Sequence, residues 1–238
     1  MSRNPATPVM LTRPRAQSDA YAAELGAAFG DRIKPVISPL LEIRDLPFQD
    51  DLDDARMLLF SSANGVRAFS RQCQRRDIPC LCVGEKTTGI ARKLGFQAQS
   101  AGGSAPDLVA LAKRQLRTET GAFVHIRGQS TRGNIARTLD KSGMNARDLI
   151  VYTQEAMELS DEAKYILTNG QHVLLPLFSP RTAEVFHLQS EAFDLCGVTA
   201  ICISDNVRLA LPKERFCRVL VAPEPTAAAI TREIAAAL

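Results

Sequence analysis

The feature that most constrains the fold is a regular alternation of short apolar runs with longer amphipathic stretches. The runs at 57–61, 123–126 and 173–178 have the length of a strand, and apolar residues at helical spacing follow them. Such alternation is typical of βαβ units, which build parallel sheets. We therefore predict an α/β protein with parallel, flavodoxin-like sheets.

Two parts of the chain resemble each other and suggest a repeated domain. The segment at 60–69 parallels the segment at 177–186, so that Ser62 aligns with Ser179. A second pair of apolar runs follows at a similar distance in each part. The middle of the chain continues with further strand–helix units, whereas the C-terminal third ends before them.

The N-terminal residues can supply the units that the C-terminal third lacks. The stretch at 11–14 resembles the one at 126–128, and each is followed by a helix and another strand. The alternative is chance similarity among βα units. The repeat predicts one discontinuous domain, one continuous domain and two extended crossings between them; these are residues 1–38 with 157–238, residues 43–149, and residues 36–43 and 149–156.

Composition excludes several classes of function. The formal net charge is only +3, and the chain has no Trp and three Tyr, which argues against a nucleic-acid binder with stacking aromatic residues. No apolar run approaches the ~18 residues of a membrane-spanning helix. The six cysteines form no Cys-x-x-Cys pair, and reduced thiols fit the cytosol. We expect a cytoplasmic monomer that binds neither nucleic acid nor membrane.

The common cofactor and metal motifs are not complete in this sequence. The stretch at 128–133 has the glycine spacing of a P-loop, but Asn134 and Ile135 stand where Lys and Ser or Thr are required. No Gly-x-Gly-x-x-Gly occurs. The three histidines are scattered and are interpreted as structural or surface residues. No metal and no cofactor are therefore predicted.

Small or hydroxylated residues recur where a predicted strand runs into a helix. In parallel sheets such turns line the carboxyl edge, where ligands bind, and free amides at a helix start favour anions. Ordinary helix capping explains any single one of them. Together they predict an anion-binding site, to which four arginines at strand ends would contribute. The turns are 62–65, 84–87, 128–130, 179–182 and 223–226, and the arginines are Arg13, Arg127, Arg132 and Arg181.

A series of short motifs extends over nearly the whole chain. The motifs are Leu11-Thr-Arg-Pro14, Phe60-Ser-Ser-Ala-Asn-Gly-Val66, Val83-Gly-Glu-Lys-Thr87, Ile126-Arg-Gly128, Val151-Tyr152, Phe178-Ser-Pro180 and Ala222-Pro-Glu-Pro-Thr226. Taken in this order, the series resembles uroporphyrinogen-III synthase. One departure is the stretch at 203–208, which replaces the Gly-x-x-Thr-Ala pattern common at that turn.

The resemblance implies two α/β domains joined by a two-stranded connection and a lyase that needs no cofactor. Its substrate would be hydroxymethylbilane, a linear tetrapyrrole with eight carboxylates. The reaction would remove the terminal hydroxyl as water, invert the last ring and close the macrocycle. The alternative is a non-catalytic two-domain protein that binds a tetrapyrrole or small anion. The missing glycine and lysine motifs argue against a third option, a nucleotide-binding enzyme.

The resemblance also assigns roles to residues. Tyr152 matches a tyrosine proposed to help the hydroxyl depart, although it could equally only pack between the domains. The expected substrate-binding residues come from the strand-end turns. They are Arg13, Ser62, Asn64, Gly65, Lys86, Thr87, Arg127, Gly128, Arg132, Ser179, Arg181, Thr182 and Thr226.

Overall fold

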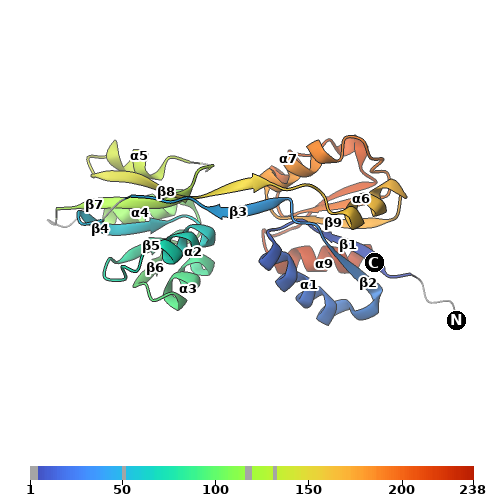
Figure 1. Ribbon diagram of the computed structural model, residues 1–238, viewed down its shortest axis with the longest axis horizontal. Coiled ribbons are helices and arrows are strands. Elements are labelled where there is room, and N and C mark those ends of the chain that lie inside the picture. The colour runs from blue at the N-terminus through green and yellow to red at the C-terminus, as the bar shows by residue number, and fades with distance from the viewer. Residues whose placement is uncertain (1–4, 50–51, 116–119, 131–132) are drawn as a thin grey trace. The chain divides into compact units, whose positions relative to one another are not determined.

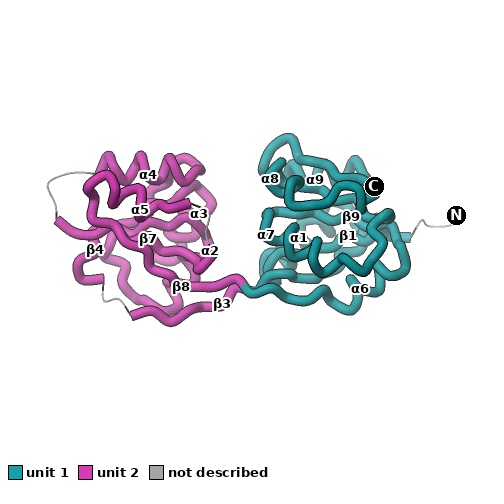
Figure 2. Tube along the Cα trace, turned by 90° about the horizontal axis from the view of Figure 1, so that it is seen from above, with its two compact units in different colours: residues 1–42, 155–238 teal, residues 43–154 magenta. Residues whose placement is uncertain are grey.

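The chain divides into two compact units in the computed structural model, which describes residues 5–49, 52–115, 120–130 and 133–238. Unit 1 combines residues 1–42 with 155–238, and unit 2 comprises residues 43–154 (Figures 1 and 2). The two divisions, after residue 42 and after residue 154, fall inside the stretches that the sequence predicts as crossings.

Unit 2 contains a six-stranded sheet with the order β3-β8-β7-β4-β5-β6. Pairing is parallel from β8 through β7, β4 and β5 to β6. The strands are β3 (Leu41–Asp45), β4 (Ala55–Phe60), β5 (Cys80–Cys82), β6 (Ala98–Ser100), β7 (Ala122–Gly128) and β8 (Ala146–Ala156).

Helices cover both faces of this sheet because its strands are apolar on both sides. On one face, α2 and α3 pack their apolar residues against Leu58, Phe60 and Val124. On the other face, α4 and α5 pack against Leu59 and Phe123. The helices are α2 (Ala63–Gln72), α3 (Glu85–Lys93), α4 (Ala105–Arg114) and α5 (Ile135–Asp140).

Unit 1 contains a five-stranded sheet with the order β11-β10-β9-β1-β2, in which every pairing is parallel. Strand β1, close to the N-terminus, therefore lies beside β9 from the last third of the chain (Figure 1). The strands are β1 (Thr7–Leu11), β2 (Ile33–Ile37), β9 (Val173–Leu177), β10 (Val198–Cys202) and β11 (Arg218–Val221).

The helices of unit 1 also form two layers. On one face of the sheet, Tyr21 of α1 and Ile230 of α9 pack with Val9. On the opposite face, Ile166 of α6 and Phe186 of α7 pack with other buried apolar residues. None of the described helices is long and apolar enough to cross a membrane. The helices are α1 (Arg15–Phe29), α6 (Asp161–Thr168), α7 (Pro180–Gln189), α8 (Asp205–Arg208) and α9 (Ala227–Ala237), with 3₁₀ turns η1 (Gly30–Arg32) and η2 (Lys213–Arg215).

The predicted α/β class with parallel, flavodoxin-like sheets is confirmed. Numbered in chain order (β1, β2, β9, β10, β11), the sheet of unit 1 runs 2-1-3-4-5, which is the order of flavodoxin. In unit 2, strands β4 to β8 run 3-2-1-4-5, a circular permutation of that order, and β3 adds a sixth strand beside β8. The apolar runs locate the strands, but the order depends on where each crossover places the next strand, and local periodicity does not encode that choice.

Predicted helix starts are confirmed where a Ser or Thr caps the helix. Ser179 and Thr226 each accept a backbone N–H from the first turn, and Ser104 forms a capping box with Asp107. The turn at 128–130 differs from expectation because it does not run directly into a helix. Helix α5 begins only at Ile135.

Candidate active site

The carboxyl ends of β4, β7 and β8 bring several predicted site residues to one edge of the unit 2 sheet. Phe60 of β4 is level with Ile126 of β7, and Gly128 of β7 is level with Tyr152 of β8. Ser62 follows β4 by two residues. Polar side chains from three neighbouring strands therefore meet where doubly wound sheets bind their ligands.

The Tyr152 ring lies directly against Gly128 and reaches Ser62. Its hydroxyl oxygen is 3.1 Å from Ser62 Oγ, and the residue is only 6% exposed. A Cβ at Gly128 would lie 2.6 Å from Tyr152 Cζ, so only glycine leaves space for the ring at its present position. The Gln129 N–H donates to the Tyr152 carbonyl at 2.8 Å, which ties the two strand ends together.

Ser62 also caps helix α2, and this role fixes its position. Its Oγ accepts the Gly65 N–H at 3.1 Å, and its carbonyl accepts the Val66 N–H. A Cβ at Gly65 would lie 3.1 Å from the Ile126 carbonyl oxygen, which shows how closely α2 approaches β7. Asn64 belongs to the first turn, which contains no acidic residue. The helix start therefore keeps its attraction for an anion.

Arg127 is held in place by Asp148 and by backbone carbonyls. Its Nε is 3.0 Å from Asp148 Oδ2, and its Nη1 donates to the carbonyls of Gly128 and Gln129 at 2.9 and 3.2 Å. Burial raises the pKa of Asp148, but the hydrogen bond from His125 and the charge of Arg127 outweigh it, so that the pKa lies below its ordinary value. The Arg127 side chain is 18% exposed and is thus a fixed cation near the strand end.

The next strand end carries Lys86 and Thr87. Strand β5 pairs with β4, and α3 begins immediately after Gly84. Lys86 is exposed and Thr87 is buried. A Cβ at Gly84 would lie 3.2 Å from Gly103 Cα, so the turn after β5 packs against the turn after β6. Of the two predicted residues, Lys86 therefore offers the larger surface to a ligand.

Unit 1 places Arg13 at the carboxyl end of β1, beside the end of β9. The guanidinium carbon lies 4.3 Å from the centre of the Phe178 ring, and Nη2 donates to Gln17 Oε1 at 2.7 Å. Burial lowers the pKa of Arg13, while Tyr21 and Glu24 partly oppose that effect. The side chain keeps its charge and has a defined orientation.

The remaining predicted residues of unit 1 differ in exposure. Ser179 Oγ is 2.8 Å from Thr182 Oγ1 and accepts the Thr182 N–H at 3.1 Å, so these two form one polar group at the start of α7. The Arg181 side chain is 52% exposed and lies 3.5 Å from Glu184. Thr226 caps α9. Arg132 lies outside the described residues.

Two residues that contact this edge from within β7 and β8, His125 and Asp148, were not selected from the sequence. His125 is buried between Asp148 and Ser61, with distances of 2.8 Å from Nδ1 to Asp148 Oδ1 and 2.9 Å from Nε2 to Ser61 Oγ. The three residues are distant in sequence and follow no recognised spacing. Only the pairing of β4, β7 and β8 brings them together.

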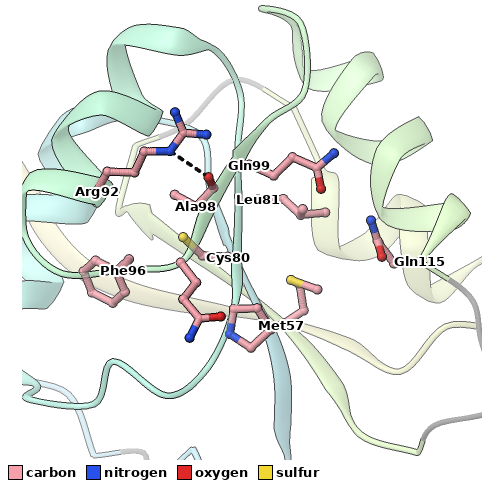
Figure 3. A pocket seen from close by; sticks show the side chains of 10 residues that line it. Met57, Cys80, Leu81, Arg92, Phe96, Ala98, Gln99 and Gln115 are labelled. Carbon is pink, nitrogen blue, oxygen red and sulfur yellow. Dashed lines mark hydrogen bonds between the residues drawn. The ribbon is translucent and has the colours of Figure 1, made fainter.

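A pocket of about 570 Å³ opens at the other end of the unit 2 strands (Figure 3). It is lined by residues at the starts of β5 and β6, including Cys80 and Ala98, and by Arg92, whose Nε donates to the Ala98 carbonyl at 3.0 Å. None of its lining residues is a predicted site residue. Because ligands of doubly wound sheets bind at the carboxyl edge, we do not place the active site here.

Over the described parts of the chain, no group of three or more His, Cys, Asp or Glu side chains is arranged to hold a metal ion. All six cysteines are free thiols. Burial raises the pKa of Cys202 to about 12, so that this thiol stays protonated at neutral pH.

Two doubly wound α/β units with polar strand ends are typical of the class of proteins that bind a ligand at the carboxyl edges of parallel sheets. The family model described as "Uroporphyrinogen-III synthase HemD" matches residues 19–232, and the chain belongs to this family. It is therefore an enzyme, a cyclising lyase of tetrapyrrole biosynthesis, as the sequence motifs predict.

Solved structures agree on the fold. The chain is similar to uroporphyrinogen-III synthetase from Helicobacter pylori, with 17% identity, coverage of 98% of this chain and 100% of that one, and a TM-score of 0.72. It is also similar to a mutant uroporphyrinogen III synthase from Thermus thermophilus, with 15% identity, 98% coverage of both chains and a TM-score of 0.57. No curated protein matches the sequence.

Proposed function

We propose that this chain dehydrates and cyclises hydroxymethylbilane, with inversion of the last pyrrole ring, to give uroporphyrinogen III. Family membership supports the reaction. The observation that carries the proposal for the site is the contact between the Tyr152 hydroxyl and Ser62 Oγ at 3.1 Å, at the carboxyl edge of the unit 2 sheet.

The reaction does not need a strong catalytic acid or base. The nitrogen of the terminal pyrrole supplies the electron pair that breaks the C–O bond, and the hydroxyl leaves as water after it gains a proton. Tyr152 would donate a hydrogen bond to that hydroxyl, and Ser62 would orient the phenol. The carbon left electron-deficient then forms the spiro bond, and ring opening and closure complete the inversion.

The larger task is to hold a flexible polyanion in one conformation. Arg127 and Arg13 are both oriented by neighbouring side chains and can receive substrate carboxylates. The starts of α2 and α7 add backbone amides. Positioning of this kind can contribute several kcal/mol to the rate without a strong catalytic acid.

The proposal predicts the isomer of the product. Purified protein incubated with hydroxymethylbilane should give the type III macrocycle, identified after oxidation to the porphyrin by chromatography of the isomers. Spontaneous closure gives type I, so a reaction without protein is the control. Formation of type I alone at the uncatalysed rate would show that the protein only binds the tetrapyrrole.

We also propose that the enzyme acts in the cytoplasm. The support is chemical: six free thiols, four of them buried or half-buried, fit a reducing compartment.

Substrate affinity should fall as salt is added. Several of the proposed contacts join partly exposed arginines to carboxylates, and the Debye length shortens from about 10 Å at 0.1 M salt to about 3 Å at 1 M. We expect KM to rise several-fold over this range while kcat changes little. Steady-state kinetics at constant pH measures both. A KM that stays constant would mean that backbone amides and shape, rather than arginines, hold the substrate.

A further inference from the structure

A continuous polar chain runs across three neighbouring strands in unit 2. Ser61 follows β4, His125 belongs to β7 and Asp148 to β8. His125 Nε2 is 2.9 Å from Ser61 Oγ and its Nδ1 is 2.8 Å from Asp148 Oδ1. The other carboxylate oxygen, Oδ2, is 3.0 Å from Arg127 Nε. The imidazole thus connects Ser61, through Asp148, to the guanidinium of Arg127.

The partners of His125 determine where its proton lies. An ionised carboxylate can only accept, so Nδ1 carries the hydrogen that faces Asp148. In the neutral ring Nε2 then accepts the hydroxyl hydrogen of Ser61. With both nitrogens engaged, the ring cannot rotate without breaking a hydrogen bond.

The burial of this ring needs an explanation beyond packing. His125 is 1% exposed and its strand neighbours Val124 and Ile126 belong to the apolar core. A polar ring in such a place is unfavourable unless its hydrogen bonds are satisfied, and an aliphatic side chain would fill the space without that requirement. What the imidazole adds is a fixed position for the Asp148 carboxylate, one of whose oxygens it holds while the other faces Arg127.

We propose that His125 is a positioning residue for substrate binding: through Asp148 it orients the Arg127 guanidinium to receive a carboxylate of the substrate. This inference rests on the proposed function, because it assigns a partner to Arg127 within that site. The group recognised is a carboxylate, since a guanidinium donates charge-assisted hydrogen bonds to carboxylate oxygens. His125 itself does not touch the substrate.

The test distinguishes a role of His125 in orienting Arg127 from a role in packing alone. His125→Leu keeps an apolar side chain of similar size and removes both hydrogen bonds, and it should raise KM by roughly tenfold with kcat little changed. His125→Asn can still donate to Asp148 and should recover much of the affinity. The matched control is His172→Leu at an exposed position in unit 1, which should leave both constants unchanged. Thermal unfolding of each variant checks that the protein is folded.

Asp148→Asn provides an independent variant if His125→Leu does not fold. It keeps the shape of the side chain but removes the charge that pairs with Arg127, and it should raise KM to a similar extent. An unchanged KM in Asp148→Asn, or in folded His125→Leu, would overturn the inference.

A double-mutant cycle shows whether His125 acts through Arg127. If it does, His125→Leu has little further effect on KM in an Arg127→Ala background. Effects that multiply would overturn the inference, as would an Arg127→Ala variant with the KM of the parent. Both outcomes are distinct from failure of the proposed function, which would appear as an absence of type III product with the unmodified chain.

Discussion

Tyr152→Phe should lower kcat for type III product by on the order of a hundredfold. The substitution removes only the hydroxyl that lies 3.1 Å from Ser62 Oγ and leaves the ring against Gly128. The leaving hydroxyl then loses its hydrogen-bond donor, whereas the contacts that hold the substrate remain. We therefore expect KM and the unfolding temperature to stay close to those of the parent. Initial-rate kinetics with isomer analysis measures the effect.

The control for this substitution is Tyr165→Phe. Tyr165 lies on α6 in unit 1 and is 64% exposed, so removal of its hydroxyl should change neither rate nor stability. Full activity in Tyr152→Phe would contradict the catalytic assignment. The mechanism would then depend on positioning alone, and the tyrosine would serve to pack the end of β8 against β7.

Gly128→Ala should impair both activity and stability, because the new methyl group would occupy the place of the Tyr152 ring. The Cβ would lie 2.6 Å from Cζ and 2.7 Å from Cε2, far inside van der Waals contact. The ring must move by about 1 Å, and a displacement of that size near the reacting groups can cost on the order of a hundredfold in rate. Overpacking of this kind costs about 1–3 kcal/mol of unfolding free energy. Kinetics and denaturant unfolding measure the two effects separately.

Gly89→Ala is the matched control for the added methyl group. Gly89 lies within α3, and a Cβ there meets no atom within 4 Å. Alanine favours a helix over glycine by up to about 1 kcal/mol, so this variant should keep its activity and gain slightly in stability. A Gly128→Ala protein as active as Gly89→Ala would show that the ring position is not set by the glycine and is not needed for turnover.

The sequence predicts the parts of the site that depend on local chemistry. Ser62, Ser179 and Thr226 are recognisable because a hydroxylated residue between a strand and a helix is a favoured cap. The family motifs extend that prediction to the function. Arg181, one of the four arginines expected at strand ends, fits an anion-binding site less well, since the structure shows it half exposed and 3.5 Å from Glu184.

Contacts between distant parts of the chain could not be predicted in the same way. The Tyr152 hydroxyl lies 90 residues from Ser62, and His125 lies 64 residues from Ser61 and 23 from Asp148. Each contact depends on which strands are neighbours and in what register they pair. The strand order was the part of the fold that the apolar pattern left undetermined, so these contacts were undetermined with it.

The position of β1 between β9 and β2 has a consequence for how the protein is made. The ribosome releases β1 and β2 first, but β9, which completes their pairing, begins only at Val173. Unit 2 is continuous over residues 43–154 and can form its sheet while the rest is still being synthesised. Strands β1 and β2 therefore remain without their partner β9 until the whole of unit 2 has been synthesised. A chain that ends early, before β9, contains one complete sheet and leaves its N-terminal strands with an unpaired backbone edge and uncovered apolar side chains, which favour aggregation.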